Sequence, residues 1–374
     1  MRILLVAPAN SSWTMNLIQY FLLPQKAEVF LYPFYGEIDD FFLDFYKKNN
    51  IHILARKIKE NKKKIPFVWL FSLKKYVKDY GIDVINLQYV QLEYLFPVSL
   101  MKKSNQRLVL SYWGSDLLRI PKWKLKISSM FLHKVDSITF ESGNLEEAFV
   151  ERYSNKCAGI RHICRFGIPI LNEIALSEQK VSKENLRNKF GIKSEKVVAI
   201  GYNALPEQQH LKVIEQIDLL PTELKQKICI LLQVNYNISS KEYVKEVEET
   251  AKKTGCEVLA IHSYMNFAQI AEIRRITDIF INSQTTDALA GSVCEVLYAG
   301  GILVHGEWLN YSEFKEYDIQ YVPYWEFNEL ADLLSNVLKA DYEIDREKNR
   351  AIIEEMRGWD SCGKEWTKWL LGEK

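Results

Sequence analysis

Short apolar runs alternate with longer amphipathic stretches along the first half of the chain. Such alternation is typical of parallel βαβ units, in which short buried strands are joined by helices. The helical stretch 68–80 is followed by Gly81, which suits the left-handed conformation that ends many helices. The pattern therefore predicts a doubly wound sheet with strands at 2–7, 27–32, 51–55, 83–88, 107–112 and 136–140.

A second series of alternating runs occupies the other half of the chain. The pattern lapses over 168–182, which we expect to be a linker between two domains. The tail 345–371 is amphipathic and carries Trp359, Trp366 and Trp369, so we expect a closing helix that packs back across the first domain. The second series predicts strands at 196–201, 227–234, 257–261, 278–282, 301–305 and 319–322.

The composition fits two globular α/β domains. The chain has 374 residues, 48% hydrophobic and 26% charged, and a single core rarely serves such a length, so two domains of about 170 residues are expected. The run 2–7 soon meets Pro8 and polar residues, which is typical of a buried strand rather than a secretory signal. No run approaches the ~18 apolar residues that a spanning helix needs. We therefore expect a cytoplasmic protein.

The six cysteines are scattered, with no C-x-x-C pair and no histidine at metal-ligand spacing. This distribution suits a reducing compartment and argues against a structural zinc site. We therefore expect buried thiols and no metal requirement.

Charge is divided unequally between the two halves. Residues 1–170 carry 25 Lys and Arg against 15 Asp and Glu, a net charge of +10, whereas residues 171–374 carry 24 against 33, a net charge of −9. The halves are therefore expected to meet different partners.

Two stretches of the basic half, 55–78 and 119–134, interleave cations with aromatic residues. This combination suits an anionic membrane surface, to which the protein would bind peripherally on the inner face. The alternative is a solvated helix face over a buried aromatic core. Nucleic acid also binds such patches, but no recognition motif accompanies them, so none is expected as a partner. The aromatic residues are Trp69, Phe71, Trp123 and Phe131.

The segment 278–305 is the most informative for chemistry. A strand runs into a polar loop, a Gly-Ser pair opens a helix, and Gly300 and Gly301 end it. The free N–H groups at the helix start, at Gly291, Ser292 and Val293, favour a diphosphate. One turn further, Glu295 has a carboxylate that can accept hydrogen bonds from two ribose hydroxyls. The segment therefore indicates a nucleotide site; the alternative is a generic strand-loop-helix with a chance acid.

The same segment resembles the E-x7-E motif, E-G-F-G-x-x-x-x-E-A-x-A-x-G, of retaining GT-B glycosyltransferases of family 4. Asp287 and Glu295 are eight positions apart, and Gly291 falls at or close to a motif glycine. The resemblance implies that Glu295 holds the ribose, that Gly291 and Ser292 hold the phosphates, and that Asp287 contacts hydroxyls of the transferred sugar. Aspartate replaces the usual glutamate at 287, which shortens the side chain by one methylene.

Two N-terminal loops extend the resemblance. The segment 111–116 (SYWGSD) is similar to the family's H-G-S-D loop, with Trp113 in the place of a histidine, and 136–144 resembles a family strand that ends in serine. The resemblance implies that both loops face the cleft. For Asp116 the alternative is a helix N-cap. The candidates for acceptor or cleft contacts are Trp113, Gly114, Ser115, Asp116 and Asn10.

The segment 201–217 resembles the family's G-R-x-x-x-x-K-G-x-x-x-L-I-x-A segment, whose Arg and Lys neutralise the diphosphate. In this chain Tyr202 and Gln208 stand in their places. Another source of stabilisation for the leaving diphosphate is therefore expected. The candidates are backbone donors, Asn203, His210 and Arg165.

A weaker similarity connects the chain to lipid-II-type amino-deoxysugar transferases of enterobacterial common antigen synthesis. Those proteins also have a W-G-x-D loop and lack the two cations. The similarity implies an inverting reaction, for which Asp116 is the first candidate as base.

The resemblances together imply an α/β protein of GT-B fold, with two Rossmann-like doubly wound parallel-sheet domains facing a cleft. Residues 1–170 are expected to bind the acceptor, 183–345 the donor, and 346–374 to form a helix that packs toward the first domain. The expected reaction moves a hexosyl or N-acetylhexosaminyl group from a nucleoside-diphosphate sugar to a glycan or lipid-linked acceptor, with retention, in surface polysaccharide or glycoconjugate assembly. No cofactor or metal is expected. A sugar-nucleotide epimerase or hydrolase of the same fold, and a catalytically silent partner subunit, are the alternatives.

Overall fold

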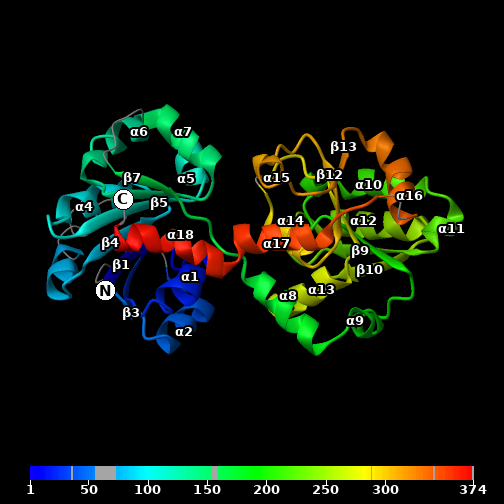
Figure 1. The fold of residues 1–374 in the computed structure, drawn as a ribbon, viewed down its shortest axis with the longest axis horizontal. Helices are drawn as coiled ribbons and strands as arrows, with labels where there is room; N and C mark the ends of the chain where they lie inside the picture. Colours follow the sequence, from blue (N-terminus) through cyan, green and yellow to red (C-terminus); the bar gives the residue numbers. More distant parts are fainter. Residues whose placement is uncertain (35–36, 55–72, 154–158, 288, 340–341, 373–374) are drawn as a thin grey trace. The chain divides into compact units, whose positions relative to one another are not determined.

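The computed structural model describes residues 1–374 apart from 35–36, 55–72, 154–158, 288, 340–341 and 373–374. The described residues form two units, each with its own parallel sheet (Figure 1). Unit 1 comprises Met1–Gly167 and Trp359–Lys374, and unit 2 comprises Ile168–Gly358. The chain therefore passes between the units twice, after Gly167 and after Gly358.

The sheet of unit 1 has seven parallel strands in the order β3-β2-β1-β4-β5-β6-β7. The strand order reverses between β1 and β4, which makes the carboxyl ends of these two strands the topological switch point of the sheet. The strands are β1 (Arg2–Ala7), β2 (Glu28–Pro33), β3 (His52–Ile53), β4 (Val84–Gln88), β5 (Arg107–Tyr112), β6 (Ser137–Phe140) and β7 (Ile160–Ile163).

Helices cover both faces of this sheet, because successive strand residues point to opposite sides. In β1, Leu4 and Val6 enter one apolar core, whereas Ile3 and Leu5 enter the other. The helical elements of unit 1 are α1 (Ser12–Leu17), η1 (Ile18–Leu22), α2 (Asp40–Lys48), α4 (Leu92–Met101), α5 (Ser115–Leu118), α6 (Lys122–Ser128), η2 (Leu132–Lys134), α7 (Gly143–Tyr153) and α18 (Trp359–Leu371).

The sheet of unit 2 has six parallel strands in the order β10-β9-β8-β11-β12-β13, with its switch point between β8 and β11. The strands are β8 (Lys196–Ile200), β9 (Ile228–Gln233), β10 (Glu257–Ile261), β11 (Ile279–Asn282), β12 (Ile302–Gly306) and β13 (Val322–Tyr324). The helical elements are α8 (Pro169–Lys180), α9 (Lys183–Lys189), η4 (Pro206–Gln208), α10 (His210–Asp218), α11 (Thr222–Lys225), α12 (Lys241–Lys253), α13 (Phe267–Ile276), α14 (Gly291–Tyr298), α15 (Ser312–Glu316), η5 (Phe327–Glu329), α16 (Leu330–Leu338) and α17 (Arg346–Arg357).

Three segments in unit 2 and the C-terminal tail differ from the sequence expectations. The expected linker 168–182 contains helix α8, which starts at Pro169 and packs on α13. The last strand was expected at 319–322 but lies at Val322–Tyr324, because the Ile319 N–H bonds to the Phe314 carbonyl and Asp318 takes a positive φ of 53° to close α15. The tail forms two helices instead of one. Of these, α17 packs on α14 in unit 2, whereas α18 belongs to unit 1.

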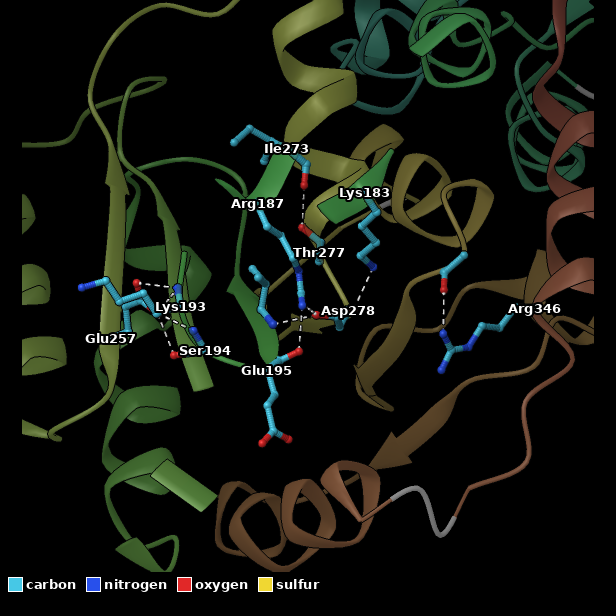
Figure 2. A network of polar contacts seen from close by, with 12 residues as sticks. Lys183, Arg187, Lys193, Ser194, Glu195, Glu257, Ile273, Thr277, Asp278 and Arg346 are labelled. Atoms are coloured by element: carbon cyan, nitrogen blue, oxygen red, sulfur yellow. Dashed lines mark hydrogen bonds and ion pairs between the residues drawn. The ribbon is translucent and has the colours of Figure 1, made fainter. Parts of the chain in front are cut away.

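A network of charges holds the amino edge of the sheet in unit 2 (Figure 2). Asp278, just before β11, accepts hydrogen bonds from Lys183 at 2.8 Å, from Arg187, and from the Val197 backbone N–H at 2.7 Å. The carboxylate side chain is only 15% exposed. One carboxylate thus ties helix α9 to strands β8 and β11, at the edge opposite the carboxyl ends where ligands bind in such sheets.

We expect Asp278→Asn to lower the free energy of unfolding of unit 2 by about 2–4 kcal/mol. The NH2 group of the asparagine would face groups that are themselves hydrogen-bond donors, and Lys183 and Arg187 would lose the negative charge that they pair with. Chemical denaturation measures this loss. The matched control is Glu249→Gln, which removes an exposed ion pair with Lys245 and is expected to cost under about 0.5 kcal/mol. Equal effects of the two substitutions would contradict a supporting role for Asp278.

Candidate functional site

The switch point of unit 2 gathers most of the residues predicted for the donor. Open parallel sheets bind ligands in the crevice at the carboxyl ends of strands where their order reverses. The segments that follow β8 and β11 meet there. The Ser283 hydroxyl donates to the Gln208 carbonyl at 2.9 Å, and the Gln209 amide donates to the Ser283 carbonyl at 2.6 Å. These bonds join the two loops into one surface.

Helix α14 begins at Gly291 beside this surface. The N–H groups of Gly291 and Ser292 lie in the first turn and have no carbonyl partner within the helix. The predicted third donor is already used, because the Val293 N–H bonds to the Ala290 carbonyl at 3.1 Å. Among the described residues, a methyl group on Gly291 would meet only Glu295 Oε1 at 3.6 Å and Ile168 Cδ1 at 4.0 Å. The helix start therefore leaves room for a ligand at the positive end of its dipole.

Several buried polar atoms of the site have no protein partner among the described residues. Neither the Ser292 hydroxyl nor the Gln284 Nε2 has a hydrogen-bond partner in the described part of the chain. The Gln208 amide lies beside Tyr202 and is only 1% exposed, yet neither of its polar atoms makes a hydrogen bond of good geometry. Buried polar groups almost always have partners, so these atoms indicate a place for a polar ligand or ordered water.

Asp287 holds the loop that leads into α14. Its Oδ2 accepts hydrogen bonds from the Tyr311 hydroxyl and, at 3.0 Å, from the Ala290 N–H. Burial raises the pKa of Tyr311 well above its usual range, and the Asp287 carboxylate adds to the shift, so the phenol stays protonated as a donor. Leu289, next in the loop, has a positive φ of 60°. Strained backbone of this kind is found at ligand sites, and here it sets the start of the helix.

Glu295 lies in a buried ion pair that the sequence did not reveal. Its Oε2 accepts from Arg274 Nε at 2.7 Å, and the two side chains are 8% and 5% exposed. The Arg274 guanidinium also donates to Gln233 Oε1 at the carboxyl end of β9. Arg274 thus brings a buried cation into the candidate site, where segment 201–217 has Tyr202 and Gln208 in place of cations. In the sequence, Arg274 and Arg275 of α13 resemble two solvated arginines, and no local pattern predicts that Arg274 is buried.

The remaining donor candidates have other surroundings. His210 is fully buried, its Nδ1 lies 3.0 Å from the Tyr243 hydroxyl, and burial lowers its pKa to about 4. A histidine that is neutral at pH 7 supplies no charge to a diphosphate. The Asn203 Oδ1 accepts from the Leu205 N–H at 3.0 Å and shapes its own loop. Arg165 belongs to unit 1, where it pairs with Glu365 at 3.7 Å.

In unit 1, Asp116 organises the loop after β5. Its Oδ1 accepts from the backbone N–H groups of Trp113 at 3.0 Å and Gly114 at 2.8 Å, and its Oδ2 from that of Val90 at 2.8 Å. Burial raises the pKa of Asp116 to about 6, while these hydrogen bonds oppose the rise. Gly114 has a φ of 141°, a conformation that favours glycine. Asp116 therefore joins two loops at the carboxyl edge and is not the N-cap of α5, which is Gly114.

An aromatic cluster lies beside Asp116. The Trp113 ring stacks on Trp13 at 5.5 Å and meets Tyr89 edge-on at 5.5 Å, and its Nε1 donates to Gln88 Oε1 at 2.7 Å. Ser115 Oγ lies 3.0 Å from the Tyr89 hydroxyl. Trp13 is 38% exposed, so the cluster presents an aromatic surface to solvent.

Sequence reasoning missed Trp13, Tyr89 and Gln88. Their positions beside Trp113 depend on the pairing of strands and on the positive φ of Tyr89, 56°. No local sequence pattern predicts either feature. Asn10, also predicted here, holds the backbone of residues 37–39 through two hydrogen bonds of 2.9 Å.

No group of three or more His, Cys, Asp or Glu side chains among the described residues is arranged to hold a metal ion. None of their helices is both long and apolar enough to cross a bilayer.

Comparison with protein families gives a match at the N-terminus. Residues 2–142, which run from β1 to just beyond β6, match the family described as glycosyl transferase 4-like. No curated protein sequence matches the chain.

Solved structures resemble the whole chain. A glycosyltransferase from Rickettsia africae is 14% identical with a TM-score of 0.76, covering 100% of this chain and 99% of that one. Anabaena HepE in complex with UDP is 14% identical with a TM-score of 0.70, covering 100% of both. Sucrose-phosphate synthase from Thermosynechococcus elongatus is 11% identical with a TM-score of 0.66, covering 100% and 98%. The predicted GT-B fold, with two Rossmann-like parallel sheets, is confirmed.

Proposed function

We propose that this protein transfers a sugar from a nucleoside-diphosphate sugar to a glycan or lipid-linked acceptor. The observation that carries the proposal is the start of α14 at the switch point of unit 2, where Gly291 leaves room at a helix N-terminus. The glycosyl transferase 4-like domain in unit 1 supports the same reaction class. UDP is the first nucleotide to test, because HepE has been solved with UDP and with UDP-glucose.

The chemistry requires that negative charge on the departing diphosphate be stabilised as an oxocarbenium-like sugar forms. The N–H groups of Gly291 and Ser292 and the dipole of α14 supply this without a metal ion. The Ser292 hydroxyl, which has no partner among the residues that the structure describes, adds a donor at the same place. Glu295 is proposed to hold the ribose, with Arg274 fixing its carboxylate. Arg274 partly replaces the two cations that the family has at the positions where this chain has Tyr202 and Gln208.

The surroundings of Asp116 favour retention over inversion. Three backbone N–H groups already bond to its carboxylate and hold it against its own loops, so few of its lone pairs are free to face the hydroxyl of an acceptor. In a retaining reaction the leaving phosphate oxygen takes that proton, and no protein base is needed. Asp287 is proposed to contact the transferred hexosyl or N-acetylhexosaminyl group.

The acceptor is proposed to bind unit 1 at the aromatic cluster of Trp13 and Trp113. Aromatic rings offer flat apolar area with fixed geometry, which suits the apolar face of a sugar ring. Surface polysaccharide or glycoconjugate assembly is the proposed setting, with the protein peripheral on the inner face of the membrane.

The decisive experiment is thermal denaturation of the purified protein with UDP, GDP, TDP, ADP and CMP, with and without their common sugars. A ligand present at 100 times its Kd stabilises the native state by about 2.7 kcal/mol, so one nucleotide class is expected to raise the Tm clearly. A folded protein that answers none of them would refute the donor site and favour a silent partner subunit. Consumption of donor at full rate without any acceptor would favour an epimerase or hydrolase.

Gly291→Ala tests the position of the site. The added methyl fits against the protein atoms around it, so the free energy of unfolding is expected to change by less than about 1 kcal/mol. The same methyl occupies the space of the diphosphate, so the Tm shift with nucleotide is expected to fall by more than half. Gly363→Ala, in α18 with a methyl position 3.6 Å from Phe21, is the matched control. A full nucleotide response of Gly291→Ala would place the site elsewhere.

A further inference from the structure

Helix α6 in unit 1 carries apolar side chains on its solvent face. Trp123 is 59% exposed, Ile127 38%, and Met130, just beyond the helix, 64%. They follow one another at spacings of four and three residues, so they form one stripe along the helix. Leu118, in the preceding α5, is 50% exposed. Contiguous exposed apolar side chains of this kind mark an interaction surface.

The aromatic residues of the basic stretch 119–134 differ in burial, and only some of them belong to the exposed stripe. Phe131, from the same basic stretch, packs against the core of unit 1 and meets Phe96 edge-on at 5.4 Å. Trp123 instead faces solvent. Most of the other basic stretch, 55–72 with Trp69 and Phe71, lies outside the described residues.

Cations flank the stripe. Lys122 and Lys126 are exposed on α6, and no carboxylate of the described residues lies within ion-pair distance of either. Lys124, by contrast, pairs with Glu93 at 2.5 Å. The stripe therefore presents uncompensated positive charge next to apolar side chains, in a half of the chain whose net charge is +10.

A cavity of about 490 Å³ opens between α6 and α7 beside these lysines. Lys122, Lys126 and Arg152 line it with Ser129 and Tyr153, and Glu151 is its one acid. Arg152 is held by a hydrogen bond of 3.1 Å to the Leu118 carbonyl. Cations and hydroxyl groups around a hollow of this size suit a phosphate headgroup.

We propose that the α6 surface, defined as Leu118, Lys122, Trp123, Lys126, Ile127 and Met130, docks unit 1 on an anionic lipid bilayer. The apolar stripe enters the interface and the lysines contact lipid phosphates. A protein partner fits less well, because lysine is depleted from protein interfaces, whereas apolar residues alternating with lysines are typical of helices that lie in a membrane surface. The proposal deepens the proposed function, on which it rests for the setting at a membrane.

The test is sedimentation of the intact protein with vesicles, without donor or acceptor. Vesicles contain phosphatidylcholine alone or with about one third phosphatidylglycerol, at about 0.1 M and about 0.5 M salt. We expect binding to the anionic vesicles that weakens at high salt. Lys122→Gln with Lys126→Gln is expected to lower the partition coefficient roughly 10- to 30-fold, and Trp123→Ser with Ile127→Ser at least about 10-fold.

The matched controls lie in unit 2. Trp325→Ser removes a tryptophan that is 62% exposed, and Lys252→Gln with Lys253→Gln removes two exposed lysines of α12; both are expected to bind vesicles as the wild type does. Absence of wild-type binding, or equal losses in the controls, would overturn the proposal. Self-association that only the α6 variants abolish would also overturn it, in favour of a protein interface. The nucleotide response of every α6 variant should equal that of the wild type, so a failure here is distinct from a failure of the donor site.

Discussion

Glu295→Ala is expected to lower the free energy of unfolding of unit 2 by about 3–5 kcal/mol and to abolish the Tm shift with nucleotide. The loss of stability follows from Arg274, which is 4% exposed and would keep its charge without the carboxylate that faces it. A buried cation stripped of its partner costs more than the pair contributed. Denaturant unfolding measures the first effect, and thermal shift with the nucleotide that stabilises the wild type measures the second.

Two further variants separate support of the fold from binding of ribose. Glu295→Gln keeps the volume and an oxygen that accepts from Arg274, so it is expected to retain most stability while losing about 1–3 kcal/mol of nucleotide affinity. Arg274→Met combined with Glu295→Leu replaces the pair by apolar groups and is expected to recover much of the stability, but not the affinity. Asp278→Asn is the control, since it destabilises unit 2 from the opposite edge of the sheet and should leave affinity unchanged. Normal affinity in Glu295→Gln would remove Glu295 from the ribose site.

The strands could be predicted because each buried strand is a continuous apolar run. β1, β5 and β10 begin and end at the predicted residues. β7 was missed because its sequence, Ile-Arg-His-Ile, is polar at its centre and lies at the sheet edge. Helix α8 was read as a linker because its apolar residues, although they pack on α13, follow a proline and a glycine that usually mark a loop.

The candidate site could be predicted only where it is local in sequence. The Gly-Ser start of α14 and the polar loop before it are contiguous, so the start of the helix at Gly291 could be predicted. The ion pair between Arg274 and Glu295 joins two residues that are 21 positions apart in the sequence. The hydrogen bond between Asp287 and Tyr311 joins two residues that are 24 positions apart. Such contacts depend on the order of strands in the sheet, which a single sequence does not reveal.

The buried ion pair of Arg274 and Glu295 bears on the absence of cations at Tyr202 and Gln208. A site that lacks two cations after β8 has instead a buried guanidinium from α13 and polar atoms without protein partners. In the proposed donor site Arg274 is already paired, so the backbone of α14 is expected to supply most of the stabilisation of a diphosphate. Binding of nucleotide should therefore depend more on Gly291 and Ser292 than on any single charge.

Trp366→Ala is expected to lower the stability of unit 1 by about 3–5 kcal/mol, as large buried aromatic residues do when truncated. Trp366 is fully buried, its ring meets Phe166 at 5.2 Å and Trp369 at 5.7 Å, and its Nε1 donates to the Arg165 carbonyl at 2.8 Å. Helix α18 is therefore part of the core beneath the sheet of unit 1. In the sequence, about 190 residues of unit 2 separate α18 from the rest of unit 1.

Hydrogen exchange distinguishes the two units in this variant. Amides of η1, β6 and β7 in unit 1 should exchange faster in Trp366→Ala, because these three elements pack directly on α18. Amides of β8 and β11 in unit 2 should keep their protection, and the nucleotide response should persist at temperatures where unit 1 remains folded. Trp325→Ala, at an exposed position, should change neither set. Loss of protection confined to unit 2 would mean that the tail stabilises unit 2, and that α18 is not needed to complete unit 1.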